Sequence, residues 1–217
     1  MLIKFFCGRT QLAMVGFMLA FTVAPLAFAG PIGFVEAQGT AYVFPAGSDT
    51  RLNVNGSQAI FANDRIEVAS GSLALNLNGG GSFSFSGPSA ASVGMLRANE
   101  VELILDHGSI SYALPHGSRG FSVRSAGVVV ANSDSDNSGA AGSIRSGAIQ
   151  RLANGELRTH ARSGNLRVTD QEGMEHTVVS GEQLSIGSDG ATKTPADDDA
   201  PEDDRRFEPA PRPQSIS

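Results

Sequence analysis

The sequence predicts an all-β domain of short, mostly antiparallel strands. Three observations carry this prediction: apolar residues alternate with polar or small ones, glycine or asparagine closes most of the alternating runs, and no sustained apolar period of three to four residues occurs. An alternation of period two places one face of a strand on the core and the other in water. The clearest runs are residues 73–77, 83–85, 101–105, 110–114, 166–168 and 184–186.

The first 29 residues are predicted to be a signal peptide rather than part of that domain. Lys4 and Arg9 form a positive n-region, residues 12–26 form an apolar core, and Ala27-Phe28-Ala29 forms an A-x-A cleavage site. This order is typical of a secretory signal that is removed, here before Gly30. The sequence therefore predicts an exported protein.

An uncleaved membrane anchor is the alternative interpretation of this segment. Its apolar stretch is short for a span of about 20 residues, and Pro25 interrupts it, which favours cleavage and no stable membrane insertion afterwards. Cys7, the only cysteine of the chain, would leave with the signal peptide. A mature chain without cysteine excludes disulfides, a thiol nucleophile and zinc–thiolate sites. Export without disulfides favours the bacterial periplasm or exterior.

The charge balance argues against nucleic acid as a partner. Loss of Lys4 and Arg9 would change the formal net charge from −6 to −8. Proteins that bind the phosphate backbone need an excess of lysine and arginine on their surface. We therefore expect no nucleic-acid partner.

Composition divides the mature chain in two. Residues 30–187 are long enough for one domain with a single core. Residues 188–217 are rich in aspartate, glutamate, proline and alanine, with Phe207 and Ile216 as their only large apolar residues. Such a segment cannot bury enough apolar surface to offset its ordering entropy, so it is expected to be a disordered acidic tail. The alternative is a docking segment that makes contact through Arg205-Arg206-Phe207.

Glycine, asparagine and proline mark the expected turns of the domain. Asn78-Gly79-Gly80-Gly81 is expected to connect a hairpin because these residues tolerate positive φ. Asp106-His107-Gly108 and Ser163-Gly164 each separate two alternating runs and are expected to be turns as well. Prolines also fall at the ends of runs, where a missing N–H costs least: Pro45, Pro88 and Pro115.

The spacing of the runs favours a sandwich or roll. Short strands that recur every 8 to 12 residues or so are typical of these architectures. A short β-solenoid of stacked rungs is the alternative, which periodicity alone leaves open. Residues 92–98 are the one segment in which a single helical turn could form.

The order of these runs resembles the periplasmic FecR domain family. Residues 34–43 resemble its opening strand. Asn63-Asp64-Arg65-Ile66 resembles its Gly-Asp-x-Ile step, with asparagine in place of glycine. Residues 72–80 resemble its next strand and turn, with Asn-Gly in place of Asp-Gly.

The later part of the chain follows the family pattern more closely. Residues 101–110 resemble the family's strand pair, and residues 157–168 resemble its later hairpin. Residues 121–125 resemble its Phe-x-Val-x-Thr-Pro strand, but Ala126 stands where proline is usual. Residues 178–184, Val-Val-Ser-Gly-Glu-Gln-Leu, match its closing Gly-Glu signature.

The resemblance covers about residues 33–187 and implies an all-β domain with interaction functions and no catalytic residues. Family regulators usually carry a cytoplasmic sigma-factor-binding region and one transmembrane helix before this domain, whereas here only the signal peptide precedes it. The family's Gly-Thr-x-Phe strand is also missing, and residues 131–139 take its place. We therefore expect a stand-alone exported member, for which the anti-sigma role is not implied.

The segment that takes that place holds a weak calcium candidate. Asp134, Asp136 and Ser138, followed by Gly139, fall at positions one, three, five and six of a calcium loop, which supplies hard oxygen ligands. Position twelve would be Arg145 instead of the usual glutamate. These residue types are also the ordinary residues of a polar turn, so no metal and no cofactor is expected.

Catalytic patterns are missing from the sequence. The histidines are scattered, without the H-x-x-x-H or H-x-H spacing of a metal pair: His107, His116, His160 and His176. No G-x-S-x-G elbow and no Walker lysine occur. Asp170, Glu172 and Glu175 lie close together, but a hairpin tip of this composition normally faces solvent. We expect a protein that is not an enzyme.

Five arginines gather in the last third of the domain: Arg145, Arg151, Arg158, Arg162 and Arg167. On one face they would offer a site for the acidic tail or for a polyanionic glycan. Arginines that mark the wet face of alternating strands and guard exposed edges are the simpler interpretation, because glutamates interleave with them.

These observations predict an exported, non-catalytic protein-interaction module of a bacterial envelope assembly or cell-surface signalling system. Its partner would be an envelope or secreted protein, bound through an exposed strand edge or a loop. A carbohydrate- or matrix-binding extracellular protein is the alternative, so a glycan is a possible partner. Two tyrosines and no tryptophan weaken that alternative, because sugar sites usually need aromatic faces.

Overall fold

A computed structural model describes residues 30–97, 100–115, 120–132 and 144–196. Within these ranges the chain forms fourteen β-strands and no helix, and all the strands join in one sheet. The all-β prediction is therefore confirmed. No helix among the described residues could cross a membrane.

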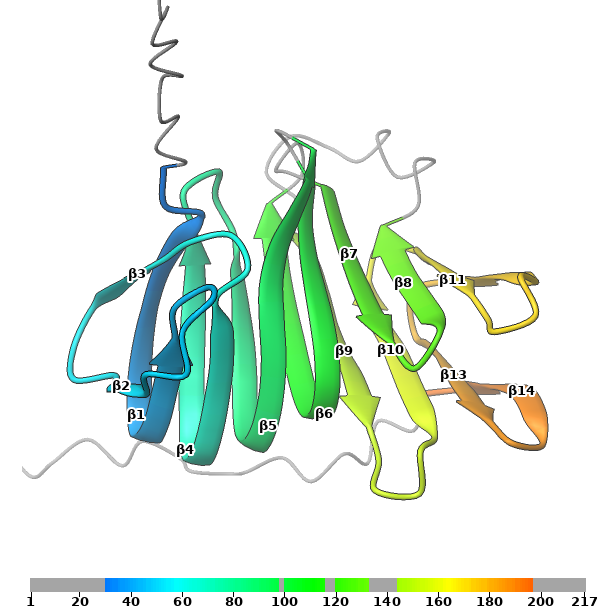
Figure 1. Cartoon of the computed structure of the whole chain (residues 1–217). Coiled ribbons are helices and arrows are strands. Elements are labelled where there is room, and N and C mark those ends of the chain that lie inside the picture. The colour runs from blue at the N-terminus through cyan, green and yellow to red at the C-terminus, as the bar shows by residue number, and fades with distance from the viewer. Residues whose placement is uncertain (1–29, 98–99, 116–119, 133–143, 197–217) are drawn as a thin grey trace, which may run out of the picture.

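Long strands dominate the first half of the sheet and shorter strands the second half (Figure 1). The strands are β1 (Gly33–Phe44), β2 (Leu52–Asn53), β3 (Gln58–Ile60), β4 (Arg65–Leu77), β5 (Ser82–Arg97), β6 (Glu100–Pro115), β7 (Gly120–Ser125), β8 (Val128–Asn132), β9 (Ile144–Arg151), β10 (Leu157–Ser163), β11 (Leu166–Thr169), β12 (Glu175–Val178), β13 (Glu182–Gly187) and β14 (Gly190–Pro195).

The sheet divides in two at β6. On one side of this strand runs the antiparallel order β5-β4-β1, with the short β2 and β3 on the outer edge of β1. On the other side, residues 100–104 pair in parallel with β7, and residues 108–115 pair antiparallel with β9. One branch continues as β7-β8-β11-β12 and the other as β9-β10-β13-β14. Figure 1 shows β9 and β10 passing behind β7 and β8.

A line of glycines crosses the four long strands where their registers shift. Gly39 of β1 lies opposite Gly71 of β4. Gly87 of β5 approaches the backbone of Ser70, and Gly108 of β6 approaches the Pro88–Ser89 backbone. The β1–β4, β4–β5 and β5–β6 pairings all change register at this line. Such β-bulges bend a strand, and glycine lets the neighbouring backbones come close.

The bulges also keep both halves of β4 and β6 on the core. In β6 the buried apolar residues have odd numbers before Gly108 and even numbers after it: Val101, Leu103 and Leu105, then Ile110, Tyr112 and Leu114. Without a one-residue shift, the second half of the strand would turn its apolar side to water.

Phe121 of β7 connects the two halves across one core. Its strand pairs with the first half of β6, but its ring packs on the first half of β5 and the second half of β6. The Phe121 ring centroid lies 5.8 Å from that of Phe83, edge to face at 71°, and 4.8 Å from that of Tyr112. The buried residues form one cluster that draws on both branches. The architecture is therefore a roll with antiparallel pairing everywhere except β6–β7, and the solenoid alternative is wrong.

Several expected turns lie inside strands. Asp106-His107-Gly108 is part of β6, and Pro88 is part of β5. Residues 92–97, in which the sequence allows a single helical turn, also belong to β5. The physical reason is that glycine serves a bulge as well as a turn, so it can bend a strand without ending it. The expected hairpin turn at residues 78–81 is confirmed, since β4 and β5 pair on either side of it.

Two further expectations are wrong. Ser163-Gly164 does not close a hairpin, because β10 and β11 lie in different branches and do not pair with each other. The sheet also continues past Gly187, where the sequence placed the end of the domain. β14 pairs along its whole length with β13, so residues 190–195 belong to the sheet, and residues 197–217 lie outside the described part of the chain.

Candidate functional site

Four hairpin turns meet at one end of the two C-terminal branches, and we call this surface the turn rim. It comprises residues 126–127 between β7 and β8, residues 152–156 between β9 and β10, residues 170–174 between β11 and β12, and residues 188–189 between β13 and β14. A cavity of about 120 Å³ is lined by residues from all four turns, which places them side by side.

Three adjoining hollows surround the β13–β14 turn. Their volumes are about 380, 120 and 190 Å³, and Gly187 and Ser188 line all three. Gly190 lines two of them and pairs with Gly187 across the turn. Because neither glycine has a side chain, the floor beneath the turn stays open.

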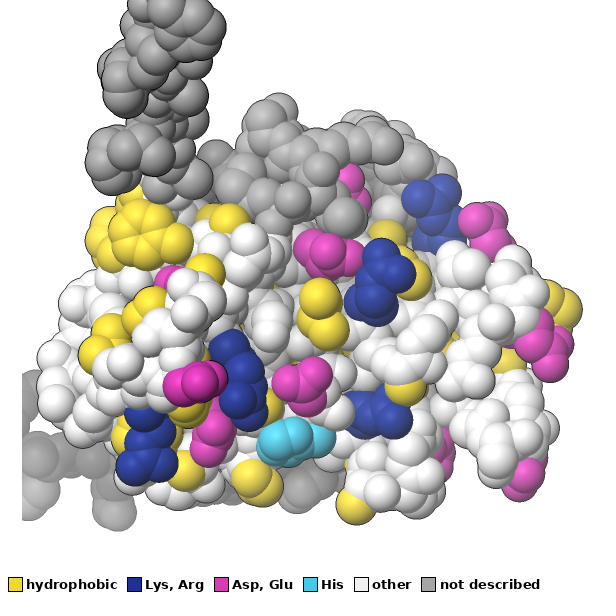
Figure 2. Space-filling view, in the orientation of Figure 1, with side chains coloured by type: hydrophobic (Ala, Val, Ile, Leu, Met, Phe, Trp, Pro, Cys, Tyr) yellow, Lys and Arg dark blue, Asp and Glu magenta, His cyan; other side chains and the backbone are white. Residues whose placement is uncertain are grey.

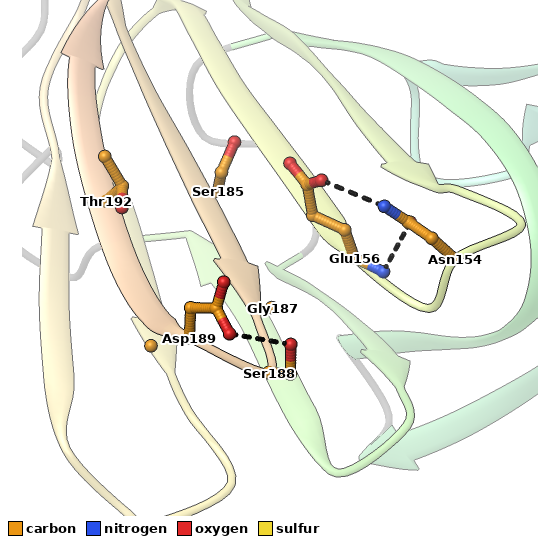
Figure 3. A pocket seen from close by; sticks show the side chains of 8 residues that line it. Asn154, Glu156, Ser185, Gly187, Ser188, Asp189 and Thr192 are labelled. Carbon is orange, nitrogen blue, oxygen red and sulfur yellow. Dashed lines mark hydrogen bonds between the residues drawn. The ribbon is translucent and has the colours of Figure 1, made fainter.

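The largest hollow has a polar lining (Figure 3). Amide, hydroxyl and carboxylate groups surround its glycine floor, and no aromatic ring does: Asn154, Glu156, Ser185, Ser188, Asp189 and Thr192. These side chains come from β13, β14 and two turns, residues 152–156 and residues 188–189. The hollow can therefore hold a polar or cationic group but offers no stacking platform.

Glu156 is held as a carboxylate at one side of this hollow. Its Oε1 accepts a hydrogen bond of 2.9 Å from Arg158 Nε, and its Oε2 accepts one of 3.4 Å from Asn154 Nδ2. The Asn154 Oδ1 atom in turn accepts the Glu156 backbone N–H at 3.0 Å. The bond from Arg158, followed by that from Asn154, lowers the pKa of Glu156. Across the floor, Asp189 Oδ1 accepts from Ser188 Oγ at 3.0 Å.

A partly apolar hollow lies on the other side of the β13–β14 turn. Met174, Ile186 and Ala191 line it together with Asp170 and Glu172. The Met174 side chain is 55% exposed, whereas Ile186 is buried. The turn rim thus combines carboxylates with a small exposed apolar surface.

Asp170 organises the turn between β11 and β12. Its Oδ1 accepts the backbone N–H groups of Glu172 and Met174, each at 2.9 Å, and its Oδ2 lies 2.9 Å from His176 Nε2. The hydrogen bond from His176 is the largest cause of the lowered pKa of Asp170. The Asp170 and Glu172 carboxylates that the sequence placed at a hairpin tip do lie there, and Glu175 begins β12 beside them.

β14 is a free edge that begins at the turn rim. Among the described residues it pairs only with β13, and all six of its own residues are exposed. Its one charged side chain is neutralised, because Lys193 Nζ lies 2.6 Å from Glu182 Oε2 and lowers the pKa of Glu182. No described strand pairs with the outer side of β14, whose backbone groups can therefore accept another strand.

The other predicted site residues do not come together. His107, His160 and His176 stand on β6, β10 and β12, and His116 lies outside the described residues. No cluster of three or more histidine, cysteine, aspartate or glutamate side chains in the described ranges could hold a metal ion. The calcium candidate of Asp134, Asp136 and Ser138 also lies outside the described residues and stays a prediction.

The five arginines do not share one face. Arg145 is buried on β9, Arg158 and Arg162 are exposed on β10, and Arg167 is exposed on β11 in the other branch. Arg151 donates to Ser125 Oγ at 3.4 Å. On the face seen in Figure 2, basic and acidic side chains lie next to each other. Ion pairs among the described residues include Arg65 with Glu67 at 3.6 Å and Arg124 with Glu102 at 3.1 Å.

Sequence reasoning missed the turn rim because its central turn fell in the predicted tail. The signal that could have found it is Asp189-Gly190, a dipeptide favoured in tight hairpin turns, with the run Leu184–Ile186 before it. The alternation of Ala191, Lys193 and Pro195 with small polar residues is too hydrophilic to be recognised as a strand.

Comparisons with known proteins give a limited likeness. No family model and no curated protein matches the chain. Two crystal structures, at 2.50 and 1.65 Å resolution, of a "putative anti-sigma factor" from Parabacteroides distasonis ATCC 8503 are similar to it. Each has a TM-score of 0.48 and 15% sequence identity, and the match covers 61% of this chain and 60% of the solved one.

Proposed function

We propose that this protein is an exported member of the FecR-domain type. It acts as a non-catalytic protein-interaction module in a bacterial envelope assembly or cell-surface signalling system. The motif order across residues 34–184 supports the family, and the signal-like segment of residues 1–29 supports a periplasmic or secreted location.

One observation carries the interaction role: the free edge of β14 starts inside the turn rim. An exposed edge is a template on which an extended partner segment can add as a further strand. The hollows at the end of β14 can then receive partner side chains, which would give specificity. The opposite edge of the sheet is less suited, because β2 and β3 already pair with β1.

Site-specific crosslinking tests this role. A photo-crosslinking amino acid replaces Thr194 on the β14 edge, and a control places it at Ser84, which is exposed on the interior strand β5. We expect one envelope or secreted protein to be crosslinked at Thr194 and not at Ser84, and the purified pair to form a complex of fixed stoichiometry. Equal crosslinking at both positions, or none at Thr194, would reject the proposal.

Carbohydrate or matrix binding is the second candidate, favoured by the hydroxyl and amide groups of the largest hollow. The lack of an aromatic ring in its lining counts against it. Retardation of the protein in gels that contain envelope polysaccharide, lost in a Thr192→Ala, Ser185→Ala double variant, would favour this candidate over the protein partner.

A further inference from the structure

We propose that the partner segment is basic and extended: it adds to the outer edge of β14 and places lysine or arginine side chains in the turn rim, next to Asp189. This inference rests on the proposed function and names the chemistry of the partner. It goes beyond the family resemblance, which says nothing about β14.

Alternate residues at the start of β14 line the largest hollow of the turn rim. Thr192 pairs with Ser185, Gly190 pairs with Gly187, and these residues line the same hollow as Glu156. They therefore share one face of the sheet. A strand added to β14 would lie about 4.8 Å beyond it, with alternate side chains on that face. A long side chain opposite Gly190 or Thr192 meets only small residues and can extend towards the β13–β14 turn.

Four carboxylates lie at the turn rim. Its carboxylates are Glu156, Asp170, Glu172 and Asp189. Arg158 engages Glu156, and His176 engages Asp170. Within the described ranges, Asp189 and Glu172 have no basic partner; Arg151 lines the 120 Å³ hollow and donates to Ser125 Oγ rather than to either carboxylate. The rim is therefore complementary to a positively charged segment, and burial of the added strand would strengthen the attraction.

Two other occupants fit less well. A second copy that paired through its own β14 would bring one basic side chain, Lys193, which is already paired with Glu182 of its own chain and so offers no free positive charge to the rim. The chain after Ala196 contains seven acidic residues and three arginines, so it would be repelled by an acidic rim. A basic segment of another protein avoids both conflicts.

Fluorescence anisotropy with labelled octapeptides tests the inference. The probes are an alternating lysine–threonine peptide, an alternating glutamate–threonine peptide, and the lysine–threonine peptide with every second backbone nitrogen methylated. We expect the lysine peptide to bind at least tenfold more tightly than the glutamate peptide. We also expect methylation to weaken its binding at least tenfold, because strand addition needs the N–H donors whereas simple charge attraction does not.

Charge reversal locates the site. Asp189→Lys and Glu172→Lys should each weaken binding of the lysine peptide about tenfold, and Asp49→Lys, in an exposed loop far along the chain, should leave it unchanged. Circular dichroism and the urea midpoint confirm that each variant is folded. Equal loss with Asp49→Lys, or no loss with either rim variant, would overturn the inference.

Two further results separate this inference from the proposed function. If the protein crosslinked at Thr194 is still captured by the Asp189→Lys and Glu172→Lys variants, the basic chemistry is wrong while the interaction module stands. If a chain that ends at Ala196 instead binds the lysine peptide tenfold more tightly than the complete chain, the tail occupies the β14 edge. The inference that the added segment belongs to another protein would then be wrong.

Discussion

Gly39 of β1 lies directly opposite Gly71 of β4, and both have positive φ, at 125° and 77°. A Cβ atom on Gly71 would overlap the carbonyl oxygen of Gln38, and one on Gly39 would overlap that of Ser70. The two backbones therefore approach more closely than any other residue type permits. This contact fixes the bulge at which the β1–β4 register shifts.

Replacing Gly71 by alanine should accordingly destabilise the protein by roughly 2–4 kcal/mol, through positive φ together with the backbone overlap. Gly80→Ala is the matched control, because Gly80 has φ 85° and no atom within 4 Å of the added Cβ. It should cost only about 1 kcal/mol. Urea unfolding measures both, and equal losses would show that the close approach contributes nothing.

The sequence predicted the alternating core but not the path of the chain. The buried apolar positions of β4, β5 and β6 follow from period two, and the hairpin at residues 78–81 follows from its glycines. Gly108 looks in the sequence like a turn residue, yet it bends one continuous strand. A residue's tolerance of positive φ is local, whereas the choice between a bulge and a turn depends on the partner strands.

The candidate site was less accessible to sequence reasoning. Three of its four turns join strands that could be recognised by their apolar alternation, but their meeting at one end follows from the division of the sheet at β6. That division arises because β7 and β9 pair with different halves of one strand, a long-range choice that no local pattern records. β14 was missed because an edge strand buries almost nothing, so its sequence needs no apolar alternation.

Phe121→Ala should cost roughly 3–5 kcal/mol, because it leaves a cavity between the two halves of the roll. The Phe121 side chain is buried and contacts the rings of Phe83 and Tyr112. Phe61→Ala is the control: Phe61 is 43% exposed, so its loss should stay within about 1 kcal/mol. Thermal and urea unfolding would contradict the assignment of Phe121 to the core if both variants lost the same stability.

Asp64 is a structural carboxylate, and its loss should destabilise the protein without affecting the turn rim. Asp64 is 4% exposed; its Oδ1 accepts the N–H of Ala46 at 2.9 Å and its Oδ2 that of Phe61 at 2.8 Å. Asp64→Ala leaves both donors without this partner and should cost roughly 1–3 kcal/mol. Asp49→Ala, at an exposed position, should change the urea midpoint little. Unchanged stability in Asp64→Ala would show that water replaces the carboxylate.

The stability contributed by Asp170 should depend on pH in a defined direction. Its pKa in the folded protein is lowered from the ordinary value of 3.8, chiefly by the hydrogen bond from His176. A depressed carboxyl pKa stabilises the fold fully above the unfolded value, and that contribution disappears as pH falls through the folded value. The stability difference between the parent protein and Asp170→Asn should therefore be larger at pH 6 than near pH 3.

Urea unfolding at a series of pH values measures this difference. Asp49→Asn is the control, and its stability difference from the parent protein should not become smaller between pH 6 and pH 3. His176→Gln should reduce the pH dependence attributable to Asp170, because it removes the group that lowers the pKa most. The β11–β12 turn carries Met174 and Glu172 into the rim, so the same variants should weaken binding of a basic segment. If the stability difference between the parent protein and Asp170→Asn stayed constant from pH 6 to pH 3, the negative charge of Asp170 would contribute nothing to the stability of the turn.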